Sequence, residues 1–212
     1  MKIDREHIGT EHIVIHKHQC CIMMNAKCMT STIRATVLPE FGEPRLSMAF
    51  SGPLHDVPSH YLLVAFIRHP INRAKSAWKF LLRDRIADSM KPFGVFQKGM
   101  PFDEYVKAIS KISDSNANSH FASQVYRLIR NGEYLPDITV RMERLKEEWP
   151  KARDALKAKG LSFLPDTLPH WNRTKGDVSM DAYTLGLLRE RYKTDIELWE
   201  APDEFKRRFS GG

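Results

Sequence analysis

Two short segments combine positive charge with residues that start helices. Lys27 lies in a short turn, and three hydroxyl residues follow it: Thr30, Ser31 and Thr32. Such residues cap helix N-termini, where free backbone N–H groups and the helix dipole attract anions. Farther along, Arg68 ends an apolar run and Ser76 follows on the next predicted helix. This second strand–turn–helix unit therefore also places basic and hydroxyl residues where the strand gives way to the helix.

The first segment is ambiguous when it is taken alone. It lacks the Gly-x-x-x-x-Gly-Lys-Ser/Thr pattern of the Walker P-loop, since the turn has no glycine and its lysine comes early. A phosphate-binding turn and an ordinary strand–turn–helix with a solvated lysine both fit the residues. A second anion site elsewhere in the chain would favour the first interpretation.

Each of the two segments should follow a strand and precede a helix in the sequence. A strand is expected within residues 12–24, and a helix from Thr30 to about residue 38. Residues 61–67 are continuously apolar, which is typical of a strand buried on both faces of a parallel sheet. Pro70 suits the first turn of the helix that follows. Two strand–turn–helix units with polar groups at their switches predict a doubly wound sheet that binds its ligand over the strand C-termini.

The rest of the chain supplies weaker patterns. A third buried strand is expected at 137–142, and a short strand is possible at 45–50. Helices are expected at 101–109, at 143–159 and from a cap at Ser179 to about residue 198. Pro150 predicts a break or a new start within the second of these helices, and Gly160 predicts its end.

Composition limits the class of protein. The 212 residues fit one α/β domain or at most two small ones, and the net charge of +7 favours an anionic partner. We expect a single domain over 1–212, with residues 1–11 as a loose lead-in. The three cysteines are too few and too close together for a disulfide framework, which favours a reducing compartment. No signal peptide or membrane span is visible, so the expected location is cytoplasmic.

The two anion segments together resemble a known family. Residues 27–32, Lys-Cys-Met-Thr-Ser-Thr, resemble the 5′-phosphosulfate loop of sulfotransferases, and residues 66–78 resemble their 3′-phosphate motif. The form Arg-His-Pro-x-x-Arg-x-x-Ser-Ala is similar to the carbohydrate sulfotransferases of the chondroitin and HNK type, family 2. Weaker likenesses follow in the expected order at residues 118–124, 141–145 and 172–174, with Tyr192 and Asp195 beyond them. The resemblance covers roughly residues 12–199.

The resemblance implies a fold, a donor and a set of site residues. The fold would be α/β and P-loop-like, with three layers and a central, mainly parallel sheet flanked by helices. The donor would be 3′-phosphoadenosine 5′-phosphosulfate (PAPS), the product 3′-phosphoadenosine 5′-phosphate (PAP), and no metal would be required. The acceptor would be a hydroxyl, expected on a glycan, with in-line transfer to it. The implied cofactor-binding residues are Lys27, Cys28, Thr30, Ser31, Thr32, Arg68, Ser76, Arg173 and Thr174.

Catalysis also requires a charge stabiliser and a base. Lys27 is expected to stabilise charge on the leaving side, and a side chain must take the proton from the acceptor hydroxyl. His120 is the first candidate base and His55 the second. Glu143 could also serve, whereas His69 fits a turn residue better.

Two further residues raise questions about the cofactor site. Arg73 fits a structural ion-pair partner better than a cofactor contact. Met29 stands where the family often has glycine or a small residue. Its side chain would either narrow the cofactor pocket or point into the sheet.

Three other interpretations compete with a sulfotransferase. A small P-loop-like kinase would share the basic turn but needs a glycine-rich loop and a magnesium-binding acid. A non-enzymatic nucleic-acid-binding protein would need a contiguous basic face with exposed aromatics. Most aromatics here fit core positions, and Trp171 is the exception, so we expect no nucleic-acid partner. A zinc site could be built from His16, His18, Cys20 and Cys28, but their spacing matches no standard zinc module.

Overall fold

The structure is a computed structural model that describes residues 11–41, 57–82, 88–169 and 178–209. Its centre is a four-stranded sheet, and the strands in spatial order are β1 (Glu11–Ile15), β2 (Cys20–Met24), β3 (Leu62–Ile67) and β6 (Ile138–Arg141). β2, β3 and β6 run parallel, and β1 pairs antiparallel with β2. This mainly parallel sheet among helices confirms the expected α/β fold class.

The segment before the first turn forms a hairpin, and the expectation of one strand there is wrong. β1 and β2 are joined by the short 3₁₀ turn η2 (His16–His18), and Gln19 closes the turn with a φ of 48°. Ile13 is opposite Ile22 in the register. Four polar residues are enough for a hairpin turn but far too few for a parallel crossover, so the two apolar halves pair with each other.

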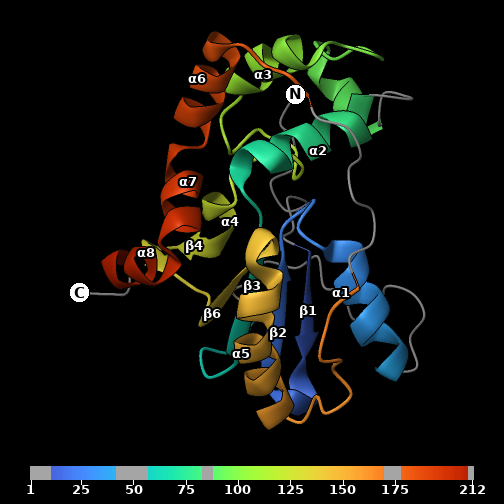
Figure 1. The fold of residues 1–212 in the computed structure, drawn as a ribbon, viewed down its shortest axis with the longest axis vertical. Coiled ribbons are helices and arrows are strands. Elements are labelled where there is room, and N and C mark those ends of the chain that lie inside the picture. Colours follow the sequence, from blue (N-terminus) through green and yellow to red (C-terminus); the bar gives the residue numbers. More distant parts are fainter. Residues whose placement is uncertain (1–10, 42–56, 83–87, 170–177, 210–212) are drawn as a thin grey trace.

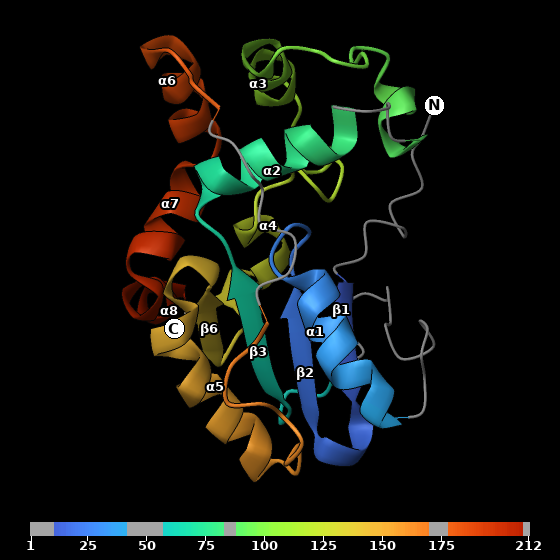
Figure 2. The same ribbon diagram turned by 45° about the vertical axis from the view of Figure 1, so that its right-hand side comes forward.

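Helices cover both faces of the sheet (Figures 1 and 2). On one face lie α1 (Thr30–Val37) and α5 (Leu145–Ala158), whose buried residues share a core with Ile22 and Phe66. On the other face lie α4 (Val125–Leu128), α7 (Lys193–Glu200) and α8 (Pro202–Phe209), which share a core with Met23 and Ile67. Because successive strand residues point to opposite faces, Phe66 and Ile67 enter different cores. The result is the expected three-layer arrangement.

A third core lies beyond the C-terminal ends of the parallel strands. It is built by α2 (Pro70–Leu82), α3 (Phe102–Ser110) and α6 (Ala182–Arg191), which pack through residues such as Leu81, Tyr105 and Leu188. Figure 2 shows α2 crossing over the ends of β2 and β3. α2 therefore faces the turns that follow both strands.

Several predicted elements are confirmed and others change. The strands at 61–67 and 137–142 and the helix at 101–109 appear as β3, β6 and α3. α5 contains Pro150 without a break or a new start, and it ends before Gly160, whose φ is +99°. The last predicted helix, from Ser179 to about residue 198, is two helices, α6 and α7, and α8 follows them. Asp181 rather than Ser179 caps α6, because its side chain accepts a hydrogen bond from Thr184 N. The possible strand at 45–50 lies outside the described residues.

The remaining described elements are short. They are η3 (Leu38–Phe41), η5 (Asp88–Phe93), η6 (Met142–Arg144) and a two-stranded sheet of β4 (Ile129–Arg130) and β5 (Glu133–Tyr134). None of the helices in the described ranges is long and apolar enough to cross a membrane.

Candidate active site

The turn after β2 is tight and contains two residues with left-handed backbone. Lys27 has a φ of +69° and Met29 a φ of +61°. Cys28 N donates to Asn25 O at 3.0 Å, and Asn25 Nδ2 donates to Phe66 O at 3.3 Å, which ties the turn to β3. Each non-glycine residue in this conformation costs about 1–2 kcal/mol, so the surrounding contacts must hold the turn in place.

The structure shows where the side chain of Met29 points. Its side chain is 8% exposed and packs in the core with Ile33 and Val37 of α1. The side chain therefore points into the layer between helix and sheet. The resemblance leads us to expect glycine or a small residue here, and glycine would adopt this positive φ without strain.

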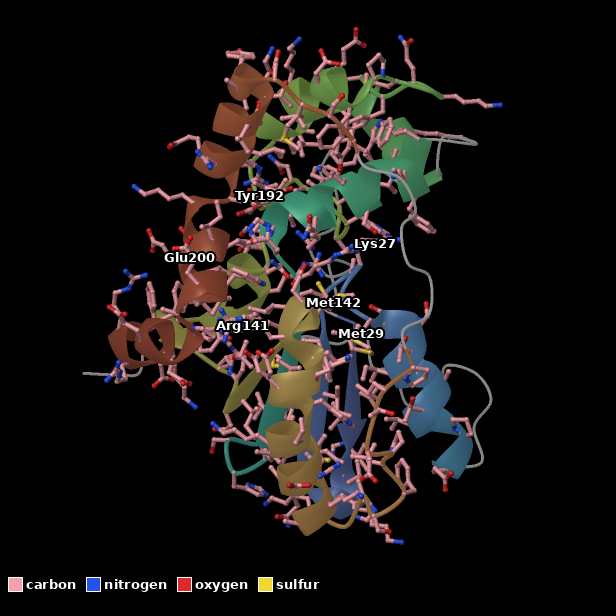
Figure 3. All side chains as sticks on the ribbon, viewed as in Figure 1. Lys27, Met29, Arg141, Met142, Tyr192 and Glu200 are labelled. Carbon is pink, nitrogen blue, oxygen red and sulfur yellow. The ribbon has the colours of Figure 1, made fainter. Side chains whose placement is uncertain are left out.

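The start of α1 presents free backbone donors. The first hydrogen bond of the helix joins Ile33 N to Met29 O at 3.0 Å. The N–H groups of residues 30–32 precede that bond and have no carbonyl partner within the helix. Together with Lys27 they form a cluster of donors and positive charge at the end of the sheet. Figure 3 shows Lys27 there, beneath α2.

The three hydroxyls at this helix start differ in their surroundings. Thr30 Oγ1 donates to Asn25 O at 3.3 Å, and Thr32 Oγ1 donates to Pro169 O at 3.3 Å. Ser31 is exposed. Ser31 is thus the hydroxyl best placed for a ligand, whereas the two threonines brace the turn.

Cys28 faces inward. It is fully buried, its Sγ–H donates to Gln124 Oε1 at 3.2 Å, and burial raises its pKa to about 12. Its N–H is already bonded to Asn25 O. Both donors of Cys28 therefore serve the interior of the protein.

The turn after β3 contacts the first turn directly. Arg68 Nη1 donates to Lys27 O at 3.4 Å, and Arg68 Nε lies 4.0 Å from a Glu143 carboxylate oxygen. Ser76, on α2, is 6% exposed. The two predicted anion segments, which are distant in sequence, are thus neighbours at the C-terminal ends of the parallel strands.

Arg73 braces the site from inside. It is 1% exposed, and its guanidinium donates to Ala26 O at 3.1 Å, Ala122 O at 2.8 Å and Ser119 O at 2.9 Å. One side chain thereby links the first turn to the segment that contains His120. These contacts favour a structural role of Arg73 over a cofactor contact, but the partners are backbone carbonyls and not the carboxylate of the expected ion pair.

Phe80 brings the two candidate catalytic residues together, which the sequence analysis missed. Lys27 Nζ lies 4.0 Å from the centroid of the Phe80 ring, and the His120 ring stacks on Phe80 at 5.1 Å with an interplanar angle of 18°. Phe80 is 56% exposed. The sequence did contain one indication that Phe80 belongs to the site. Its spacing from residues 73 and 76 places it on the same face of α2 as these two residues.

His120 is held as a neutral imidazole. Its Nδ1 lies 2.8 Å from Asn118 Oδ1, an acceptor, so Nδ1 carries the proton and Nε2 keeps its lone pair. Burial, with Lys27 and Arg73 as further causes, lowers the pKa of His120 to about 4. At neutral pH this side chain can accept a proton.

The other candidate bases are less free or lie elsewhere. The Glu143 carboxylate accepts bonds from His69 N at 3.1 Å, Asn72 Nδ2 at 3.2 Å and Trp199 Nε1 at 3.1 Å, so it secures the start of α2. Burial lowers the pKa of His69, whose ring meets Trp199 edge-on at 4.8 Å. His55 lies outside the described residues.

The C-terminal residues named by the resemblance divide into two groups. Arg173 and Thr174 lie outside the described residues. Tyr192 and Asp195 are buried and bond to the backbone of residues 121–125. This second pair supports the His120 segment from behind.

A pocket of about 760 Å³ opens beside Arg68. It lies between the start of α2, the start of α5 and the segment at 166–168, and Asn72, Glu143 and Trp149 line it. Its size is within the range of small-ligand sites in proteins.

The residues of the zinc interpretation have other partners. His16 Nδ1 is 2.9 Å from Tyr61 Oη, and His18 Nδ1 is 2.7 Å from Lys159 O. Cys20 is buried, and burial raises its pKa to about 11. Within the described ranges, no three His, Cys, Asp or Glu side chains are grouped so as to hold a metal ion.

Comparison with protein families identifies the chain. The model of the Sulfotransferase family, which includes carbohydrate sulfotransferases, matches residues 16–200. Comparisons with curated proteins and with solved structures return no match. The matched region contains both turns, α2 and the His120 segment, which are the parts that build the site described above. The chain therefore belongs to the sulfotransferase family, whose members use PAPS as the sulfuryl donor.

Proposed function

We propose that this protein transfers the sulfuryl group of PAPS to a hydroxyl of a carbohydrate acceptor. The observation that carries the proposal is that two cationic turns follow adjacent parallel strands and lie side by side, with Arg68 Nη1 3.4 Å from Lys27 O. A nucleotide with anionic groups at both its 5′ and 3′ ends matches two adjoining anion sites. A ligand with one phosphate would need only one of them.

The residues present fit such a nucleotide. Lys27, Ser31 and the N–H groups of residues 30–32 would hold the 5′ end, and Arg68 with Ser76 would hold the 3′-phosphate. Burial and the neighbouring Arg68 lower the pKa of Lys27, so positive charge at this edge is not fully compensated, and an anion would stabilise it.

The resemblance adds further cofactor contacts. It assigns Arg173 and Thr174 to the segment that closes over the nucleotide. When bound, PAPS supplies an activated sulfuryl group, and the transfer requires no metal.

In this proposal His120 is the base. Its Nε2 lone pair takes the acceptor proton, while Asn118 keeps the ring in the required tautomer. Lys27 supplies positive charge where the leaving side becomes more negative. Because Lys27 is one cause of the low pKa of His120, an anion bound at Lys27 would make His120 a stronger base.

A thermal-shift experiment tests the proposal against its rivals. A ligand that binds only the folded state at 100 times its Kd stabilises by about 2.7 kcal/mol, which is easily measured as a higher Tm. We expect PAP to raise the Tm and ATP or DNA to leave it unchanged. A rise with ATP would favour the kinase and a rise with DNA the nucleic-acid-binding protein. Either result, without a rise with PAP, would overturn the proposal.

The acceptor, the extent of the domain and the compartment are parts of the same proposal. The likeness of residues 68–77 to glycan enzymes supports a carbohydrate acceptor, and sulfate transfer from labelled PAPS to a panel of glycans and simple phenols would test it.

We take residues 1–212 as one sulfotransferase domain. Three buried, unpaired thiols, Cys20, Cys21 and Cys28, support a reducing compartment such as the cytoplasm.

A further inference from the structure

One buried amide side chain touches both cationic turns. Gln124, at the start of α4, is completely buried. Its Oε1 accepts from Arg68 N at 2.9 Å and from Cys28 Sγ–H at 3.2 Å, and its Nε2 donates to Arg68 O at 2.9 Å. The amide therefore holds both backbone polar groups of Arg68 and the thiol of the neighbouring turn.

The amide is itself fixed from the opposite side. Asp195, on α7, is fully buried and accepts from Gln124 N at 2.8 Å and from Val125 N at 2.9 Å. Its Oδ2 also lies 3.4 Å from Gln124 Nε2. Asp195 of α7 thus fixes the orientation of the Gln124 side chain, which contacts both turns.

We propose that Gln124 is a positioning residue that sets the distance between the 5′-end and 3′-phosphate sites. The inference rests on the proposed function, because it assumes that one ligand occupies both turns. Gln124 itself contacts no ligand and acts through Arg68 and Cys28. Asp195 supports it by fixing the orientation of its amide.

The nature of the contacts explains why spacing depends on this residue. Buried backbone groups keep hydrogen-bond partners, and an apolar side chain at 124 would leave Arg68 N and Arg68 O without theirs. The end of β3 would then shift to find new partners. The bond from Arg68 Nη1 to Lys27 O, at 3.4 Å, is too long to hold the two turns at a fixed distance alone.

A ligand with two phosphates is sensitive to this distance, and a ligand with one phosphate is not. When both ends of a ligand bind, the second contact forms at a high effective concentration that depends on the match of spacing. If the turns drift apart, that advantage is lost. Affinity for each single phosphate changes little, because each turn keeps its own donors.

Calorimetric titration of Gln124→Met with three nucleotides tests the inference. PAP has phosphates at both ends, whereas 5′-AMP and 3′-AMP have one each, and the weaker ligands can be measured by displacement. We expect PAP affinity to fall about tenfold or more and each monophosphate affinity by less than about threefold. Equal losses for all three nucleotides, or an unchanged affinity for PAP, would overturn the inference.

Two further variants keep the test decisive. Cys28→Ala removes only one contact of Gln124, so this variant should fold even if Gln124→Met does not. It should lower the affinity for PAP more than the affinity for either monophosphate. Ser123→Ala is the matched control, because Ser123 Oγ donates to Asp114 Oδ2 at 2.6 Å and touches neither turn. It should lower the Tm without changing the ratio of the three affinities. If the wild-type protein does not bind PAP, the proposed function itself fails, and the inference fails with it.

Discussion

Replacement of Arg73 by lysine should strongly destabilise the protein while keeping the charge. Arg73 is buried, and its three guanidinium nitrogens donate to three different backbone carbonyls at 2.8–3.1 Å. Those carbonyls belong to two segments, the turn before α1 and the stretch at 119–122. A lysine ammonium is a single point at the end of a flexible stem and cannot reach all three.

The expected magnitude follows from the number of bonds lost. A hydrogen bond from a charged donor contributes about 1.5–3 kcal/mol, and Arg73→Lys should lose two of the three. The free energy of unfolding should therefore fall by about 3–6 kcal/mol. Since a domain of this size is stable by about 5–15 kcal/mol, the change should be large but measurable.

Urea denaturation followed by circular dichroism checks the prediction. Arg208→Lys is the control, because Arg208 lies on the surface and its ion pair with Glu197 at 2.7 Å is solvent-exposed. The control should change the free energy of unfolding by less than about 1 kcal/mol. An Arg73→Lys variant within about 1 kcal/mol of wild type would refute the assignment of Arg73 as the brace of the site.

Four other predictions follow from the site. Arg68→Ala should weaken PAP binding by about 2 kcal/mol in calorimetry, because it removes a charge-assisted contact; unchanged affinity would remove Arg68 from the cofactor site. His120→Ala should spare PAP binding and abolish most sulfate transfer, and normal transfer would place the base elsewhere. The folded-state pKa of His120, about 4, is below the unfolded value near 6.5, so the stability it contributes is complete above pH 6.5 and is lost as pH falls toward 4. At pH 5 that loss is about 2 kcal/mol, and urea titrations should show a flatter pH dependence for His120→Gln; parallel curves would contradict it. Met29→Gly should relieve about 1 kcal/mol of backbone strain but lose about 2–5 kcal/mol of buried side chain, so thermal denaturation should show a lower Tm; a higher Tm would mean that strain outweighs packing.

The β3–α2 unit was predictable because its signals are local. Seven consecutive apolar residues, then Pro70, then apolar residues at helical spacing specify strand, turn and helix in sequence. The hairpin of β1 and β2 was not found, because the four polar residues between its apolar halves, 16–19, include no glycine, proline, asparagine or aspartate to mark a turn. The helices α6 and α7 were merged because Tyr192, which lies between them, does not resemble a helix breaker.

The residues that complete the site were harder to predict, because their roles depend on distant contacts. Gln124 stands in a segment that the resemblance included, yet its partners are 56 and 96 positions away. Apart from its helical spacing, nothing in the sequence distinguishes Phe80 from other aromatic residues, and only the fold places Lys27 and His120 against its ring. Sequence patterns identified the groups with charge, and the fold identified the neutral groups that position them.

Neutral partners also explain how the site keeps its positive charge. Among the described residues, Glu143 is the one carboxylate within ion-pair distance of Lys27, Arg68 or Arg73, and it is 4.0 Å from Arg68. Lys27 rests on the Phe80 ring and Arg73 on backbone carbonyls, so both are stabilised without a counter-charge. A carboxylate in place of either partner would cancel the field that attracts an anion. Affinity for a doubly charged nucleotide thus depends less on the net charge of +7 than on which cations are left uncompensated at this edge of the sheet.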